Sequence, residues 1–409
     1  MINDLVKELE NEVGKCISCG FCESVCPTLP AAGYNLWKGA RGRVILGKEL
    51  LSTIKDNETI NVSDSFYSCL DCQACLYVCP AGVNAGKVSH ISKSIIASDT
   101  ITGNQNPLAK MMARVTMRYM NPLGVREKCA DWFKGMKADP GSNDLLYTGN
   151  MYQLMAYNKG MDSMRERMGK NLSEKMSSLV STIPGLMKLA PVKRDEIIGQ
   201  KMDKTLSNIA LLLRKAGISF NYLGEAEPYP GTFIHDLGYL DLFEKYAKKI
   251  AKILKNSGAK RIITVDPHTY DLLKNVYPKY VDDFDLDIVH YLDLIDKSSF
   301  IGGSDSITYH EPCHFSLRDD AYNRPLETLK TVANVSLPAR SGRRTKCCGG
   351  PDELIFPELT RKISEDRYRE LQETKAEKIV TACPICFSNL NKGPEVIEIG
   401  DYLMSKLKN

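Results

Sequence analysis

No apolar run of about 18 residues, the length needed for a membrane-spanning helix, occurs in this 409-residue chain. Its first residues, MINDLVKELENEVGK, have no apolar core, which argues against a secretory signal. The sequence also lacks a G-x-G-x-x-G fingerprint, a phosphate-binding loop and a nucleophile–base pair. We therefore expect it to bind neither flavin nor NAD, so that hydride chemistry would need a partner. Its net charge of +4 is too small to indicate nucleic acid binding.

The 14 cysteines stand out in a chain whose composition is otherwise that of an ordinary globular protein. Its length suggests about two or three domains. Eight cysteines form two short runs, five lie between residues 313 and 386, and Cys129 stands alone. Because no secretory signal is present, we expect a cytoplasmic protein, in which clustered thiols are metal ligands rather than disulfides.

The two N-terminal runs share the spacing C-x2-C-x2-C-x3-C-P, which is typical of bacterial ferredoxins. A short loop with this spacing can wrap three corners of a cubane cluster, and the fourth corner needs a ligand from elsewhere. In two-cluster modules that ligand is the last cysteine of the other run. The spacing predicts two 4Fe-4S clusters, one held by Cys16, Cys19, Cys22 and Cys79 and the other by Cys69, Cys72, Cys75 and Cys26.

Structural zinc is the alternative for these runs. Zinc sites use two C-x2-C pairs, whereas each run here has four cysteines followed by Pro27 or Pro80, which fits two iron–sulfur clusters better. Arg41 and Arg43 lie between the runs, at the start of a helix expected at about 43–55. They could raise the potential of an anionic cluster, or form a solvated basic turn.

Five further cysteines lie in the C-terminal part: Cys313, Cys347, Cys348, Cys383 and Cys386. The residues around them predict strands at 306–309 and 378–382 and helices at 319–334 and 359–374. Cysteines that follow parallel strands lie at the carboxyl edge of a sheet, where α/β proteins place their sites. A turn at Gly349-Gly350 could direct the two adjacent cysteines toward one centre.

A copy of this pattern without cysteines lies upstream. Residues 261–270, RIITVDPHTY, parallel residues 378–387, KIVTACPICF, and further stretches match at 146–152 and 224–230. We therefore expect a second unit of the same fold that holds no thiolate-bound cluster. The places of the cysteines are taken there by Asn150, the Ala226–Glu227 region, Asp266 and Thr269.

Two ferredoxin runs followed by C-x33-CC-x34-C-x2-C resemble, from Cys16 to Cys386, the heterodisulfide reductase D-type family. Its relatives include the iron–sulfur subunits of glycolate oxidase and anaerobic glycerol-3-phosphate dehydrogenase. The resemblance implies an α+β multidomain fold, with an α-helical two-cluster ferredoxin-like domain and two α/β cysteine-rich repeats, called CCG domains. It also implies a third, non-cubane 4Fe-4S cluster, or zinc as in some relatives, held by Cys313, Cys347, Cys348, Cys383 and Cys386.

The middle of the chain is rich in methionine, with 13 of the 15 methionines between residues 100 and 204. We interpret this segment as a helical layer packed on the core, because methionine fills gaps there. A basic docking surface for a flavoprotein or a membrane is the alternative. The expected domains are 1–100 (ferredoxin-type), 101–145 (helical linker), 146–300 (degenerate CCG, with an insertion at about 153–204) and 301–409 (intact CCG).

Few single residues invite interpretation. Cys129 has no partner spacing and is expected to be a buried, inert thiol. His310 and His314 flank Cys313, and they could hydrogen-bond cluster sulfur or cap the following helix. His90 is interpreted as a surface or packing residue, because four thiolates already complete each cubane. The sequence gives no reason to assign chemistry to His235, His268 or His290.

Relatives that cleave the heterodisulfide are thought to use two CCG clusters, and this chain keeps the cysteines of one. The pattern favours an iron–sulfur electron-transfer subunit of an oxidoreductase complex. It would relay electrons between a flavin-containing dehydrogenase, of the hydroxy acid or glycerol 3-phosphate type, and a quinone, thiol/disulfide or other carrier. The expected partners are that flavoprotein, a membrane-anchoring redox subunit, or both, with peripheral membrane contact. A disulfide reductase acting at the C-terminal cluster and a non-catalytic scaffold or sensor stay open.

The ligand assignment predicts a metal content. Anaerobically purified protein should contain about 12 iron per chain for three clusters, or about 8 with one zinc. Cys383→Ser should remove the spectroscopic signal of the C-terminal centre and leave both cubane signals in place. Iron and zinc analysis with EPR of the reduced protein would measure this. Loss of all three signals in a folded variant would contradict the ligand partition.

Overall fold

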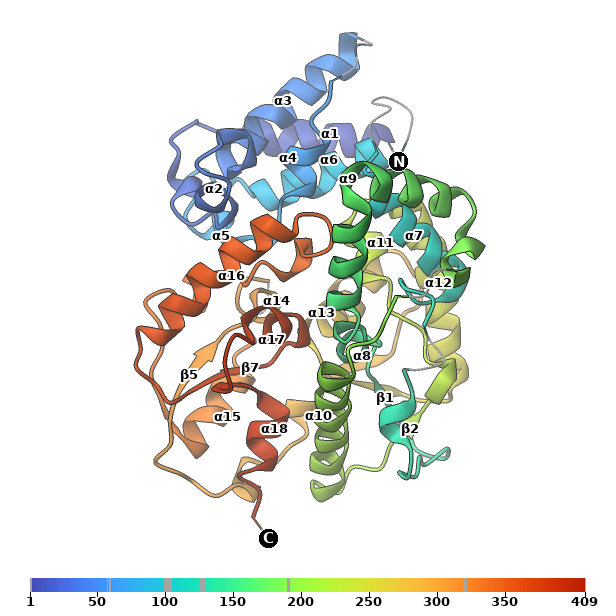
Figure 1. Ribbon diagram of the computed structural model, residues 1–409, viewed down its shortest axis with the longest axis vertical. Coiled ribbons are helices and arrows are strands. Elements are labelled where there is room, and N and C mark those ends of the chain that lie inside the picture. The colour runs from blue at the N-terminus through green and yellow to red at the C-terminus, as the bar shows by residue number, and fades with distance from the viewer. Residues whose placement is uncertain are drawn as a thin grey trace.

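The computed structural model describes residues 2–56, 58, 60–98, 105–125, 129–189, 192–318 and 322–408. A helical N-terminal unit lies above two units that each contain a small parallel sheet, and the two sheet units stand side by side (Figure 1). This arrangement confirms the expected α+β fold class. None of the helices within these ranges combines the length and the apolar character needed to cross a membrane.

Three longer helices, α1, α3 and α6, form the body of the N-terminal unit. Their apolar faces meet, so that Leu9, Leu50 and Val88 are fully buried, and shorter helices carry the cysteine loops. The helices here are α1 (Ile2–Gly14), η1 (Phe21–Glu23), α2 (Thr28–Ala31), η2 (Leu36–Lys38), α3 (Ala40–Asp56), α4 (Ser63–Tyr67), α5 (Ala74–Tyr77) and α6 (Ala85–Ala97), and α7 (Pro107–Tyr119) and η4 (Asp131–Phe133) lead into the next unit.

Both sheets have four parallel strands, in the orders β2-β1-β3-β4 and β6-β5-β7-β8. Their central strands are apolar and buried, as strands with helices on both faces require. The two units therefore share one topology, as the internal repeat predicted. The strands are β1 (Asp144–Tyr147), β2 (Asn221–Tyr222), β3 (Arg261–Thr264), β4 (Asp287–His290), β5 (Ser306–His310), β6 (Asn334–Val335), β7 (Lys378–Thr381) and β8 (Val396–Glu398).

Short helices begin at the same places in both units. Asp266 after β3 and Cys383 after β7 are each the residue before a short helix that starts with proline. A glycine with left-handed backbone, Gly231 or Gly349, directly precedes the second short helix after β2 or β6. The local backbone around the cysteines is thus repeated in the unit that lacks them.

The remaining helices follow the sheets in chain order. The first unit has α8 (Met151–Met155), α9 (Asn158–Thr182), η5 (Pro184–Leu189), α10 (Glu196–Lys215), η6 (Gly224–Ala226), α11 (Thr232–Asp236), α12 (Leu240–Asn256), α13 (Pro267–Asp271), η7 (Leu272–Val276), η8 (Tyr277–Lys279), η9 (Tyr291–Asp293) and η10 (Lys297–Ser299). The second has α14 (Cys313–Ser316), α15 (Arg324–Val332), η11 (Gly342–Arg344), η12 (Gly350–Asp352), α16 (Pro357–Gln372), α17 (Pro384–Leu390) and α18 (Ile399–Met404).

The expected strands and helices around the C-terminal cysteines are confirmed, with small shifts. The helix expected at 359–374 is α16, and the one expected at 319–334 is the shorter α15; residues 319–321 lie outside the described ranges. In the described part of the chain, α9 and η5 have no counterpart between β5 and β6. The limits of the domains and of the insertion stay predictions.

The methionine-rich segment packs on the core, as interpreted from the sequence. Six of its methionines are buried: Met111, Met112, Met151, Met155, Met187 and Met202. Four more, Met117, Met120, Met136 and Met161, are partly buried against the same core. Methionine here fills space between helices.

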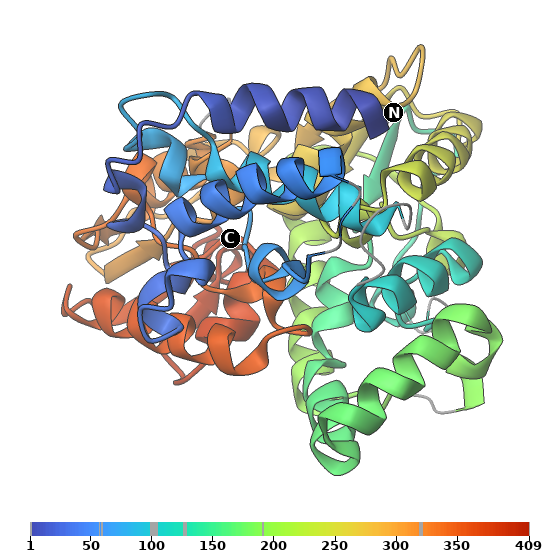
Figure 2. The ribbon, with the colours of Figure 1, turned by 90° about the horizontal axis from the view of Figure 1, so that it is seen from above.

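The N-terminal unit contacts both sheet units, which Figure 2 shows from above. Toward the first, the Tyr67 hydroxyl donates to the carbonyl of Leu237 at 3.2 Å. Toward the second, the Tyr77 hydroxyl donates to the carbonyl of Leu317 at 3.0 Å. Leu70 of the second cysteine loop packs in one apolar cluster with Cys313. These contacts bring the cysteine loops against the C-terminal cysteines.

Gly238 makes one of these contacts possible and gives a test of the interface. It has φ +85°, and a Cβ there would lie 2.6 Å from the backbone of Lys93 and Ser94 in α6. Gly238→Ala should cost about 2–4 kcal/mol, from left-handed backbone strain and overpacking. The matched control is Gly217→Ala, with φ +77° and no atom within 4 Å, which should cost about 1–2 kcal/mol. Thermal unfolding measures the stability of both variants. Equal losses of stability would show that α6 can shift to accommodate the added methyl group without cost.

Candidate metal centres

The last cysteine of each N-terminal run lies with the first three cysteines of the other run. Cys16, Cys19, Cys22 and Cys79 line one small cavity, and Cys26, Cys69, Cys72 and Cys75 line another. This is the crossed grouping that the spacing predicted. Four thiols around one cavity can hold a cubane, and the binding of the clusters themselves stays a prediction.

Arg43 lies beside the second cavity and is fully buried. Its Nη1 donates to Thr28 Oγ1 at 3.0 Å and lies 3.7 Å from Cys26 Sγ. Its Nε donates to the carbonyl of Ser65 at 2.8 Å. A fixed guanidinium beside a ligand thiolate favours its charged form and raises the potential of an anionic cluster. For Arg43, the interpretation as a solvated basic turn is therefore wrong.

Arg41 behaves differently. Its side chain is one-third exposed and pairs with Glu23 at 3.2 Å, at the rim of the first cavity. A single ion pair that solvent partly reaches contributes little stabilisation. The two arginines that the sequence grouped together thus have separate environments.

The five C-terminal thiols meet in one buried group. Cys348 Sγ and Cys386 Sγ lie 3.3 Å apart, and the backbone N–H of Gly349 donates to Cys347 Sγ at 3.4 Å. The left-handed backbone of Gly349, φ +91°, makes the turn that lets adjacent cysteines face one centre. The buried thiols are those of Cys313, Cys347, Cys348, Cys383 and Cys386.

These thiols cannot all ionise unaided. The neighbouring Cys347 thiol, and then burial, hold the pKa of Cys313 well above its ordinary value. Burial, and then Cys348, do the same for the pKa of Cys386. Contact with Cys347 and Cys386 instead lowers the pKa of Cys348. Most of these five thiols would therefore stay protonated by themselves. A bound cation would stabilise their thiolate forms.

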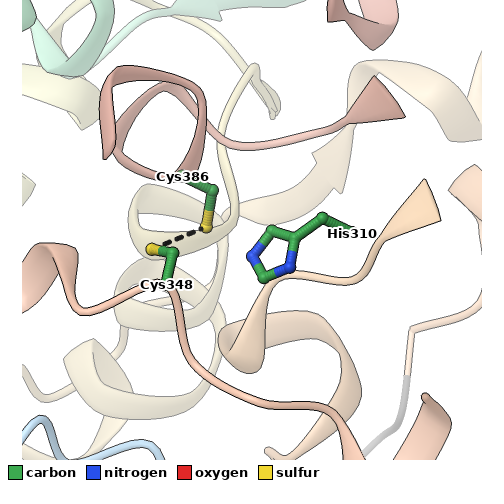
Figure 3. A group of neighbouring side chains, drawn as sticks. All are labelled: His310, Cys348 and Cys386. Atoms are coloured by element: carbon green, nitrogen blue, oxygen red, sulfur yellow. Dashed lines mark hydrogen bonds between the residues drawn. The ribbon is translucent and has the colours of Figure 1, made fainter. Parts of the chain in front are cut away.

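His310 is held beside this group by Arg367, which is fully buried. Arg367 Nε donates to His310 Nδ1 at 3.1 Å. Because a guanidinium can only donate, Nδ1 must accept, and the proton of a neutral ring sits on Nε2. Figure 3 shows the other ring nitrogen directed at Cys348 and Cys386, with ligand atoms of the three residues within 4.8 Å of one another. His310 is thus built to donate N–H to sulfur rather than to bind a metal.

The three cysteine groups form a row. Burial raises the pKa of Cys22, in the first group, to about 12, and the nearby charges of Cys79 and Cys26 add to this rise. Burial, followed by the charge of Cys313, raises the pKa of Cys72 in the second group well above its ordinary value. The first and second cavities share Ala85, and Cys72 packs against the cluster that contains Cys313 and Cys347, so the second group adjoins both of the others.

The site of the upstream unit holds oxygen atoms in place of sulfur. Asp266 accepts from the backbone N–H groups of His268 and Thr269 at 3.0 and 2.9 Å. Glu227 accepts from the N–H of Thr148 at 3.1 Å. Burial raises the pKa of Glu227 to about 8 and that of Asp266 to about 6.

The counterparts of Cys347 and Cys348 in the upstream unit lie further along the chain than the sequence repeat predicted. The glycine with left-handed backbone is Gly231 upstream and Gly349 downstream. The residues in the places of Cys347 and Cys348 are therefore Tyr229 and Pro230, not the Ala226–Glu227 region. Backbone conformation fixes this equivalence, whereas the sequence offered two glycines, Gly224 and Gly231, that could each have matched.

Three residues outside the cysteine groups, Cys129, His268 and His314, were also considered in the sequence. Cys129 is buried and contacts Asn121 Nδ2 at 3.8 Å, as expected for a thiol without a partner spacing. His314 donates to Asp271 rather than to sulfur, with His314 Nδ1 and Asp271 Oδ2 3.0 Å apart. His268, to which the sequence assigned no role, lies against His314 with ring centroids 3.9 Å apart. No local pattern could have indicated this contact, because 46 positions separate the two residues in the chain.

Two family models match the chain. One, described as a 4Fe-4S dicluster domain, matches residues 12–83, and one described as a cysteine-rich domain matches residues 307–391. A ferredoxin-type domain is thus followed, further along the chain, by a CCG domain. This confirms the expected order of the domains.

Curated relatives carry the comparison further. The chain is 22% identical to the D-type subunit of the CoB–CoM heterodisulfide reductase of Methanosarcina barkeri, over 95% of this chain and 90% of that protein. It is 22% identical to a probable glycolate oxidase iron–sulfur subunit of Bacillus subtilis, over 94% and 90%. It is 29% identical to the probable iron–sulfur-binding oxidoreductase FadF of Bacillus subtilis, over 50% of this chain but only 30% of FadF. The expected resemblance is confirmed.

The geometry of His310 gives a redox prediction. His310→Phe should lower the reduction potential of the C-terminal centre by about 60 mV. The reason is that a hydrogen bond to a charged group contributes about 1.5 kcal/mol, and a tenfold change in the equilibrium constant of a one-electron couple corresponds to about 59 mV. Arg367→Met removes the hydrogen bond that fixes the tautomer of His310. It should lower the reduction potential of the C-terminal centre as well, but by less.

Redox titration followed by EPR measures these shifts, and the two cubane potentials of the same sample are the internal control. A potential that is unchanged in both variants would mean that His310 does not donate to the centre.

Proposed function

We propose that this chain is the electron-transfer subunit of an oxidoreductase complex, and that three iron–sulfur centres carry the electrons. The first cubane would be held by Cys16, Cys19, Cys22 and Cys79, the second by Cys69, Cys72, Cys75 and Cys26, and the C-terminal non-cubane cluster by Cys313, Cys347, Cys348, Cys383 and Cys386. The observation that carries the proposal is the row of three cysteine groups, in which the first and second cavities share Ala85 and Cys72 packs against the cluster that contains Cys313 and Cys347.

This row supports transfer in single-electron steps. The clusters supply the redox chemistry, while the chain holds them close together and sets their potentials. Arg43 lies beside Cys26 of the second group, and His310 directs its Nε2 toward the sulfur atoms of the C-terminal group, where a bound cluster could accept its N–H. The second group would thus pass electrons between the other two.

The first group is the proposed contact point with a partner. Cys19 is exposed there, and the same loop carries Ile17 and Phe21, which are 66% and 61% exposed. Exposed apolar side chains beside a redox centre favour docking of another protein. We assign this face to a flavoprotein dehydrogenase subunit, in line with the relative described as a glycolate oxidase iron–sulfur subunit.

Disulfide reduction at the C-terminal group is the second candidate, and the relative from the heterodisulfide reductase of Methanosarcina barkeri favours it. The upstream unit offers buried carboxylates where a second thiolate cluster would be needed. For this reason we propose relay rather than disulfide cleavage as the main activity. Failure of the reduced protein to cleave a disulfide substrate would support this choice.

For the location we propose the cytoplasm, with peripheral contact to a membrane-anchored subunit. The methionine-rich segment supports this contact, because several of its apolar side chains stay exposed. These are Leu172, Leu179, Ile183, Leu189 and Ile197.

Phe21→Glu tests the docking face. The flavoprotein that copurifies with the chain is mixed with the variant, and the rate of cluster reduction by its reduced flavin is followed in a stopped-flow instrument. We expect the KM for the partner to rise about tenfold, which corresponds to a loss of about 1.4 kcal/mol of binding free energy. The control is Ile301→Glu, which charges an apolar residue of similar exposure, 54%, outside both proposed contact surfaces.

The EPR spectra of both variants should match that of the unmodified protein. Equal KM values for all three proteins would place the docking face elsewhere.

A further inference from the structure

A cluster of histidines and carboxylates lies where the three units meet, outside the cysteine groups. At its centre are Asp236 at the end of α11, His268 in α13 and His314 in α14. Their potential ligand atoms lie within 4.8 Å of one another. Because α11 and α13 belong to the first sheet unit and α14 to the second, the cluster joins the two.

Asp271 prepares one of these histidines for binding. Its carboxylate is 3.0 Å from His314 Nδ1, and Arg318 Nε is 3.4 Å from the same oxygen. An ionised carboxylate only accepts, so Nδ1 donates and the lone pair of the neutral ring is on Nε2. Histidines that bind metals commonly donate their other N–H to a carboxylate, which fixes the tautomer and the orientation of the ring.

The charges around the cluster favour a cation. Three carboxylates, those of Asp71, Asp236 and Asp271, face the cations Arg318 and Lys93, and His235 Nδ1 lies 2.9 Å from one Asp236 oxygen, which leaves the other oxygen of Asp236 for an ion. Arg318 lies 3.8 Å from Asp71 and 3.4 Å from Asp271, and Lys93 Nζ donates to the backbone carbonyls of Cys69 and Asp236, at 3.1 and 3.4 Å. The Asp236 side chain is 25% exposed, which gives an ion a path to the site.

We propose that Asp236, His268 and His314 bind one divalent transition-metal ion, with Asp271 orienting His314. Two imidazoles and a carboxylate form a ligand set that suits Zn²⁺ or Fe²⁺ and leaves room for water. His314 directly follows Cys313, so the ion clamps the helix that carries a C-terminal cysteine against the first sheet unit. This site uses no cysteine and does not depend on the proposed relay of electrons.

The test uses the full-length, anaerobically purified protein with its clusters in place. Excess Zn²⁺ is added and removed by desalting, iron and zinc are counted, and X-ray absorption is recorded at the zinc edge. Zinc is the appropriate probe because it binds nitrogen and oxygen ligands more tightly than Fe²⁺ does. We expect about one retained zinc with ligands at about 2.0–2.1 Å and no sulfur at about 2.3 Å.

Two variants sharpen the result. His268→Gln should lose this zinc and keep its cluster iron, whereas the control His290→Gln, a change at another fully buried histidine, should keep both. No retained zinc, zinc bound only to sulfur, or unchanged zinc in folded His268→Gln would overturn the proposal. If His268→Gln does not fold, the zinc X-ray absorption of the unmodified protein tests the proposal, because sulfur ligands there would contradict it.

Discussion

The buried thiols of the second and the C-terminal cysteine groups pose the constraint on which the rest of this structure depends. Taking several potential thiolates out of water is unfavourable unless positive charge or hydrogen-bond donors accompany them. The surrounding fold supplies such partners. Arg43 is buried beside Cys26, the N–H of Gly349 points to Cys347, and His310 is turned toward sulfur by Arg367. Iron or zinc would complete the compensation that these groups begin.

The two sheet units show what the same backbone does with and without this constraint. Asp266 caps its helix by accepting from two backbone N–H groups. Cys383, in the same place, makes no capping hydrogen bond with its side chain, which leaves its sulfur free for a ligand role. The upstream unit thus gains local hydrogen bonds where the downstream unit keeps thiols available. This contrast explains how the same topology can have a structural role in the upstream unit and provide a candidate metal site in the downstream unit.

The N-terminal unit is more than an attached ferredoxin. It lies on both sheet units, and its second cysteine loop packs against Cys313 and Cys347. The polar cluster of Asp236, His268 and His314 lies at the same junction. The proposed relay of electrons through the second group would therefore depend on a contact between units, not only on the cysteine loops themselves.

Sequence alone determined the features that depend on neighbouring residues. Spacing gave the crossed grouping of the eight N-terminal cysteines, and apolar patterns gave the strands around Cys313 and Cys383, because loops and strands are set locally. Tertiary structure alone decided which side chains from distant elements meet. Arg43 beside Cys26, Arg367 behind His310, and His268 against His314 come from segments 17, 57 and 46 positions apart. No local pattern encodes such contacts, since they arise only when helices and sheets pack against one another.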